Sequence, residues 1–140
     1  MVITRTISVS TQAGTAVADI TEDVKERVAQ SGVVDGVVTV FVPGATGAVT
    51  TIEYEPGLVH DLAEYFDRTI PEDIHYQHEE RWHDENGHSH IRASLLGPSI
   101  CVPFKDTRLL LGTWQQIVFV DFDVRARERE LIIQIMGESE

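Results

Sequence analysis

The chain has 140 residues, one cysteine and a formal net charge of −12 at pH 7. This length is typical of one folded domain, and one cysteine excludes an internal disulfide. Binding to nucleic acid or to anionic membrane normally needs a basic patch, so the acidic balance argues against both partners. The one concentration of basic residues, Arg125, Arg127 and Arg129, is interrupted by Glu128 and Glu130.

No apolar stretch is long enough to cross a bilayer, and the N-terminus MVITRTISVS alternates where a signal peptide would have an apolar segment. We therefore expect a cytoplasmic protein. Cys101 lies between Ile100 and Val102 in an apolar run. This setting predicts a buried, inert thiol rather than a catalytic nucleophile.

The first half of the chain predicts strands separated by one helix. Residues 2–10 alternate between apolar and polar side chains, as a half-exposed strand does. A helix should begin after the capping pair Asp19 and Glu22 and end at Ser31-Gly32. Residues 37–42 are β-branched or aromatic and predict a strand buried on both faces, and residues 49–54 predict the next strand.

Between these two strands lies the segment Pro43-Gly44-Ala45-Thr46-Gly47. Such a segment lets the backbone approach a ligand closely, although an ordinary turn or bulge has the same composition.

The second half predicts two further helices and the remaining strands. Leu58, Leu62, Tyr65 and Phe66 have helical spacing, and Ile70-Pro71 ends that helix. A short helix before Gly97-Pro98 is followed by strands at 99–104, at 109–123 as one long strand or two, and at 130–136. Together these elements predict an α+β class: a mainly antiparallel β-sandwich with two or three inserted helices, in a single domain spanning residues 1–140.

Five of the six histidines lie between His75 and His90, interleaved with carboxylates. Neutral imidazole and carboxylate are common ligands of zinc and similar divalent ions. We interpret His78, His88 and His90 as candidate metal ligands, for zinc or magnesium, and His75 and His83 as surface residues. A solvated polar loop has a similar composition, and no HExxH or CxxC spacing is present.

The start of the short helix offers a second use for this region. Ser89 or His90 would lie at its N-terminus, where free N–H groups and a partial positive charge bind phosphate readily.

Several motifs together resemble one family. They are FVPGATGAVTT in the segment from Val40 to Thr51, SHIRASLLGPS from Ser89, LGTWQ from Leu111 to Gln115, and the closing Gly137-Glu138. On these motifs the chain is identified as a member of the YjbQ family, also described as secondary thiamine-phosphate synthases. The resemblance covers nearly the whole chain and implies a β-rich homotrimer that often carries a metal ion. It also implies weak joining of a pyrimidine pyrophosphate to a thiazole phosphate.

The resemblance also assigns site residues. His78 and His90 match histidines of the family's motif, Asp61 matches its aspartate, and Glu53 matches the glutamate after its threonine-rich strand. His90, Asp61 and Glu53 are therefore the candidate catalytic residues. Gly44 stands where many members have a histidine, which argues against a family-wide role for that histidine in this chain.

Thr113, Gln115 and Ser89 are the candidate substrate-binding residues, because each can hydrogen-bond a ligand. A structural role at the end of a strand explains Thr113 and Gln115 equally well. The expected partners are other copies of the chain, in a homotrimer, and a small phosphorylated molecule. Thr113 or the basic stretch from Arg125 to Arg129 could complete a neighbour's site at a subunit boundary.

Three functions use the same residues. The first is synthesis of thiamine phosphate, in which a metal or a helix N-terminus would stabilise the departing pyrophosphate. The second is binding of a metal or small anion by a non-catalytic trimer. The third is metal-assisted hydrolysis of a small molecule.

Overall fold

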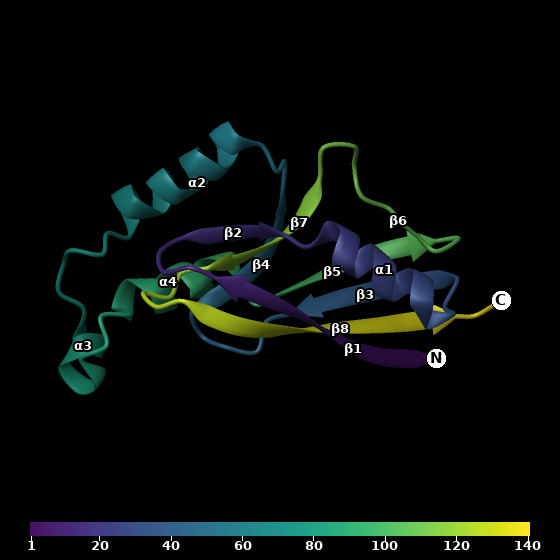
Figure 1. Ribbon diagram of the computed structural model, residues 1–140, viewed down its shortest axis with the longest axis horizontal. Coiled ribbons are helices and arrows are strands. Elements are labelled where there is room, and N and C mark those ends of the chain that lie inside the picture. Colours follow the sequence, from purple (N-terminus) through teal and green to yellow (C-terminus); the bar gives the residue numbers. More distant parts are fainter.

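Two antiparallel sheets and four helices make up the fold (Figure 1). The computed structural model describes residues 1–140. The five-stranded sheet has the order β1-β8-β3-β5-β6 and the three-stranded sheet the order β2-β7-β4, and all neighbouring strands are antiparallel. The strands are β1 (Val2–Thr11), β2 (Ala16–Asp19), β3 (Asp35–Phe41), β4 (Gly47–Ile52), β5 (Ser99–Lys105), β6 (Arg108–Leu109), β7 (Gln116–Asp121) and β8 (Arg127–Glu138). The helices are α1 (Thr21–Ser31), α2 (Pro56–Thr69), α3 (Gln77–Trp82) and α4 (Gly87–Leu96).

Alternation along β1 and β8 sets the inner face of the five-stranded sheet. Ile7 of β1 and Leu131, Ile133 and Ile135 of β8 are buried, while Thr4, Thr6 and Ser8 face outward. Because successive side chains of a strand point to opposite faces, one apolar row per strand is enough to build this side of the core. The half-exposed strand predicted at residues 2–10 is confirmed.

The three-stranded sheet is covered on both faces, and this explains its apolar centre. Ile117 and Phe119 of β7 pack in the core between the sheets, which α1 closes with Val24 and Val28. Val118 and Val120 point the other way, into a second core beneath α2 and α4. The strand buried on both faces is therefore β7. The prediction of double burial for residues 37–42 was wrong, because Phe41 is exposed on β3.

Three helices follow their predicted signals, and the α+β class is confirmed. Gly32 ends α1 with φ of 81°, and Ile70 ends α2, both as predicted. Glu55, whose role was not predicted, caps α2 by accepting hydrogen bonds from two backbone N–H groups. Asp19 caps Thr21, but Glu22 forms no reciprocal bond, so the capping box is incomplete. The fourth helix, α3, was not predicted, since its sequence QHEERW has too few apolar residues to show a period.

Cys101 corrects a second prediction. It lies on β5, where Val102 and Phe104 are buried and Cys101 points to the opposite, outer face of the sheet. Its thiol is exposed, because the apolar neighbours in sequence share the strand but alternate in direction.

No helix of the protein combines the length and apolar character that crossing a membrane requires.

Candidate metal centre and polar network

His78, Asp84 and His90 bring three side chains together where α3 meets α4. One ligand atom from each lies within 4.8 Å of the other two. The Nδ1 atom of His78 is 3.4 Å from Asp84 Oδ1, and the ring centroids of His78 and His90 are 4.4 Å apart. Two imidazoles and one carboxylate form the kind of three-ligand set that leaves a fourth zinc position open. We call these three residues the histidine cluster.

One buried atom of this cluster has no hydrogen-bond partner. His78 Nδ1 is buried and has no hydrogen-bond partner, and its approach to Asp84 lacks hydrogen-bond geometry. A buried polar atom without a partner costs about 1–3 kcal/mol, so such atoms are rare in folded proteins. A metal ion at the cluster would satisfy this nitrogen, and imidazole favours zinc over magnesium.

Close packing of α3 against the start of α4 positions the cluster. A Cβ atom at Gly87 would lie 2.5 Å from Tyr76 Cβ, so only glycine allows this approach. Glu79 Oε1 accepts a hydrogen bond of 2.6 Å from the Gly87 N–H group. The N-terminus of α4 is therefore capped by a carboxylate of the protein itself, which takes one of the donors that the predicted phosphate site would use.

The connection between the two helices is conformationally unusual. His83 and Glu85, which flank Asp84, have φ values of 55° and 62° in the left-handed region. Such conformations cost on the order of 1–3 kcal/mol and persist where the surroundings fix them, often at functional sites. Asp84 Oδ1 accepts a hydrogen bond from Asn86 N–H in the same turn.

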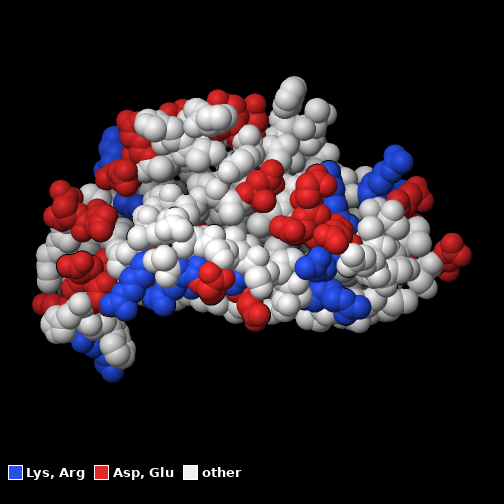
Figure 2. Space-filling view, in the orientation of Figure 1, with Lys and Arg blue, Asp and Glu red and all other residues white.

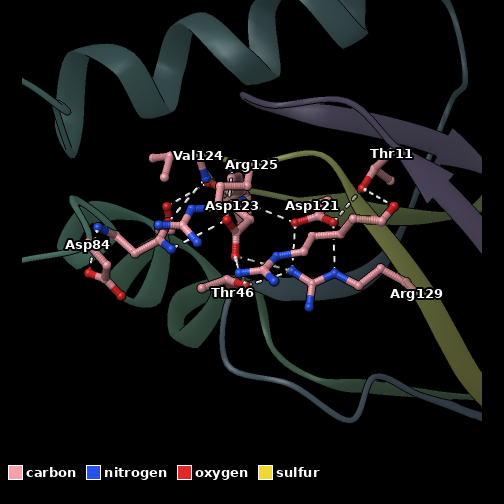
Figure 3. A network of polar contacts seen from close by, with 12 residues as sticks. Thr11, Thr46, Asp84, Asp121, Asp123, Val124, Arg125 and Arg129 are labelled. Atoms are coloured by element: carbon pink, nitrogen blue, oxygen red, sulfur yellow. Dashed lines mark hydrogen bonds and ion pairs between the residues drawn. The ribbon is translucent and has the colours of Figure 1, made fainter. Parts of the chain in front are cut away.

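Asn86 joins this turn to a buried polar network at the end of β7 (Figure 3). Its side chain donates to Asp123 Oδ1 and accepts from Val124 N–H. Burial alone would raise the pKa of the Asp123 carboxyl, but hydrogen bonds from Arg125 N–H, Asn86, Thr46 and Arg127 outweigh burial and lower that pKa. Asp123 is therefore ionised at neutral pH.

Asp121 and Arg129 form the second half of the network. The Asp121 carboxylate accepts from Arg129 Nε at 2.8 Å, from Arg129 Nη2 at 2.9 Å and from Thr11 Oγ1 at 2.6 Å. Arg129 Nη2 also donates to Thr46 Oγ1 at 2.6 Å, and Thr46 donates to Asp123. The hydrogen bond with Asp121 raises the pKa of Arg129 further above its ordinary value. Hydrogen bonds therefore connect the β8 arginine to the loop before β4 and, through Asp123, to the turn beside the histidine cluster.

His88 does not join the histidine cluster, which corrects one predicted metal ligand. Residues two apart lie on the same side of a strand but on nearly opposite faces of a helix, and this segment is helical. His88 is buried and lines a separate cavity of about 430 Å³ with Arg92 and Glu72. Burial, followed by the nearby Arg92 charge, lowers the pKa of His88, so the ring is neutral at pH 7.

The structure separates the other candidate residues from the histidine cluster. Ser89 is buried and donates to the Phe122 carbonyl at 2.6 Å, so its hydroxyl is engaged within the fold. Asp61 is exposed on α2 and groups with His60 and Glu64 in a separate cluster. Glu53 is exposed just beyond the end of β4.

Thr113 and Gln115 lie in the loop between β6 and β7 and line one cavity. His90 lines a different cavity, and the two cavities share no lining residue. The Gln115 side chain accepts a hydrogen bond from the Gly112 N–H group and donates one to the Thr51 hydroxyl. Gln115 therefore has a structural role, because it ties the loop to β4. Gly44, by contrast, does line a cavity of about 270 Å³ with His90.

Sequence reasoning missed Thr46, Asn86, Asp121 and Asp123. A signal was present: Asp121 and Asp123 interrupt a strongly apolar run, and Arg127 and Arg129 follow with the same alternation. Buried carboxylates need partners, and nearby arginines with matching period are natural ones. Figure 2 shows the charged side chains on one face of the molecule. A short basic band lies near the start of β8, and acidic side chains gather toward α2 and α3.

Comparisons with known proteins give consistent matches along the chain. The sequence model described as "UPF0047 protein YjbQ-like" matches residues 5–138. A UPF0047 protein of Archaeoglobus fulgidus is 38% identical over 120 residues, covering 86% of this chain and 90% of that protein. The UPF0047 protein YugU of Bacillus subtilis is 31% identical over 135 residues, covering 95% and 98%.

Solved structures agree with the sequence matches. A YbjQ-like protein of unknown function from Sulfolobus solfataricus superposes with a TM-score of 0.93 at 32% identity, covering 99% of both chains. A hypothetical protein from Aeropyrum pernix K1 gives a TM-score of 0.90 at 34% identity, covering 97% of this chain and 99% of that one.

Proposed function

Because this chain belongs to the UPF0047 family of YjbQ-like proteins, we propose that it is a metal-dependent transferase of the thiamine-phosphate synthase type. It would join a pyrimidine pyrophosphate to a thiazole phosphate, as a weak or secondary activity. The observation that carries the proposal is the histidine cluster with its unpaired, buried His78 nitrogen.

The chemistry requires charge stabilisation on the departing group. The thiazole nitrogen forms a bond to the carbon that bears the pyrophosphate, and the carbon–oxygen bond to pyrophosphate breaks. A divalent ion held by His78, Asp84 and His90 would supply positive charge where negative charge develops. The chain's own residues hold this set in place, since Glu79 fixes the start of α4 and Asn86 fixes the Asp84 turn.

The carboxylates around the cluster bear on the alternatives. Asp61 and Glu53 are exposed elsewhere, but Glu79 Oε1 lies 3.7 Å from His78 Nδ1 and accepts a hydrogen bond from the Gly87 N–H group. The joining reaction needs no proton removal from the attacking nitrogen, whereas hydrolysis benefits from a general base for water, a role open to Glu79. Metal-assisted hydrolysis is therefore the second candidate function, and binding of a metal or a small anion without catalysis is the third.

The test is incubation of untagged protein with both thiamine precursors, with zinc, with magnesium and with a chelator. We expect metal-dependent formation of thiamine phosphate, abolished in His90→Ala. His75→Ala is the matched control, because His75 is an exposed histidine that belongs to neither group of possible metal ligands. Zinc binding without product in the wild type would favour the non-catalytic alternative. Product of equal amount from His90→Ala would remove the cluster from the mechanism.

We also propose that the working form is a homotrimer. In its support, the outer face of the five-stranded sheet carries an apolar row, in which Val2 pairs with Met136 and Met136 pairs with Val37. Phe41 lies on the same face, and Val2, Phe41 and Met136 are all exposed in the single chain. Exposed apolar patches of this kind mark interaction surfaces, and self-association would cover it.

Light scattering coupled to size-exclusion chromatography tests the assembly, and a monomer or dimer mass at micromolar concentration would contradict the trimer. Shared sites need a second experiment. Because Thr113 is remote from its own histidine cluster, mixing His90→Ala subunits with Thr113→Ala subunits should restore activity if a neighbour supplies Thr113. Trimers that exchange without recovery would contradict sharing through this residue.

A further inference from the structure

The loop before β4 presents backbone donors that the protein does not use. The N–H groups of Gly44, Ala45 and Thr46 donate no hydrogen bond to any backbone or side-chain acceptor of the chain. Gly44 and Ala45 line a cavity that His90 also lines, so their N–H groups lie at its wall. Unpaired buried N–H groups are rare, and consecutive free N–H groups commonly form concavities that bind anions.

Arg129 lies beside this loop with one free terminal nitrogen. Its Nε and Nη2 atoms are held by Asp121 and Thr46, which fix the guanidinium in one orientation (Figure 3). The remaining nitrogen, Nη1, lies 3.5 Å from the position a Cβ atom would take at Gly44. A guanidinium already fixed by other contacts loses little conformational entropy when it binds an anion.

The cavity next to the loop is unusual for so acidic a chain. It has a volume of about 270 Å³ and is lined by Gly44, Ala45, Gly47, His90 and Ser94 among others, with no carboxylate in its lining. Four other surface cavities each include at least one aspartate or glutamate. In a protein of net charge −12, a cavity lined without carboxylates repels an anion less than a cavity lined by aspartate or glutamate does.

We propose that this loop, with Arg129, forms a phosphoryl-binding subsite beside the histidine cluster. The ligand class is a phosphate monoester or the terminal phosphate of a diphosphate, bound by the N–H groups of Gly44 and Ala45, which line the cavity, and by Arg129 Nη1 beside Gly44. His90 lines the cavity and belongs to the cluster, so a phosphate in the subsite lies next to the metal ligands. As a substrate subsite this assignment rests on the proposed function, but phosphate binding itself can be measured without any reaction.

A matched pair of variants tests the subsite. Ala45 is exposed and lines the cavity, so Ala45→Asp places a carboxylate there without disturbing the core, and Ala45→Asn places a neutral side chain of the same shape. Binding of inorganic phosphate to chelator-treated protein is measured by titration calorimetry at low ionic strength. We expect saturable binding, weakened about tenfold or more in Ala45→Asp by charge repulsion and within about threefold of wild type in Ala45→Asn.

Two results would overturn the subsite: absence of saturable phosphate binding to the wild type, or equal weakening in both variants. The outcome is separable from that of the proposed function. Phosphate binding with the expected charge dependence, but no synthesis of thiamine phosphate, refutes the proposed function and leaves the subsite standing. If the protein synthesises thiamine phosphate but does not bind inorganic phosphate at the cavity lined by Ala45, the subsite is refuted and the proposed function stands.

Discussion

Replacing Asp121 by asparagine should destabilise the protein strongly, because this carboxylate is the buried anchor of Arg129. Asp121 is 1% exposed and accepts hydrogen bonds from Arg129 Nε and Nη2, from the Thr11 hydroxyl and from Asp123 N–H. Asparagine keeps the shape but removes the charge and one oxygen acceptor.

Removing one partner of a buried ion pair typically costs about 3–5 kcal/mol, since it leaves the other charge uncompensated. Arg129 retains 15% side-chain exposure, so water relieves part of this penalty. We therefore expect a loss near the lower end, about 3 kcal/mol, or a fall in melting temperature of roughly 10 °C.

Urea denaturation followed by far-ultraviolet circular dichroism measures the loss, because Trp82 and Trp114 are already exposed in the folded protein. Glu128→Gln is the matched control, because Glu128 is exposed on β8 and its carboxylate accepts from the Ser10 hydroxyl at 2.7 Å. Its cost should stay within about 0.5 kcal/mol. If Asp121→Asn loses no more stability than Glu128→Gln, the buried pair does not anchor Arg129 and the account of the network is wrong.

Two further predictions concern single side chains. Cys101→Ser should leave zinc content and any synthase activity within a few-fold of wild type, because the thiol lies on the outer face of the five-stranded sheet; loss of either in a folded variant would contradict this. Hydrogen bonding lowers the pKa of Asp123 in the folded protein. The ionised carboxylate therefore stabilises the fold fully at pH values above its unfolded pKa of about 4, and this stabilisation is lost as the pH falls through the lower pKa of the folded protein. Urea denaturation of chelator-treated protein between neutral and acidic pH should therefore show a shallower acid loss for Asp123→Asn than for wild type, and equal slopes would refute the assignment.

Local signals predicted most of the fold. The alternation in β1, the glycine at the end of α1 and the Ile70-Pro71 pair at the end of α2 each depend on a few neighbouring residues, so these features can be predicted from the sequence alone. Exposure of a strand face is different, because it depends on what covers the sheet. Phe41 and Cys101 lie in apolar runs, yet no helix packs on the outer face of their sheet, whereas α2 and α4 cover β7.

The candidate site could be predicted only in part. His78 and His90 do lie together in the histidine cluster, as their shared place in one dense polar segment suggested. His88 lies on the other side of α4, because residues two apart in a helix point in nearly opposite directions. Arg129 approaches Thr46 across 83 positions of sequence, and only the pairing of distant strands brings them together.

Metal content tests the central claim most directly. Protein purified without a histidine tag should carry about one zinc ion per chain by elemental analysis, and His90→Ala should lose it while His75→Ala retains it. Adding zinc to chelator-treated wild type at one hundred times the dissociation constant should stabilise the fold by roughly 2.7 kcal/mol. Absence of stoichiometric metal, together with an unchanged melting temperature on adding zinc, would contradict a metal centre at His78, Asp84 and His90.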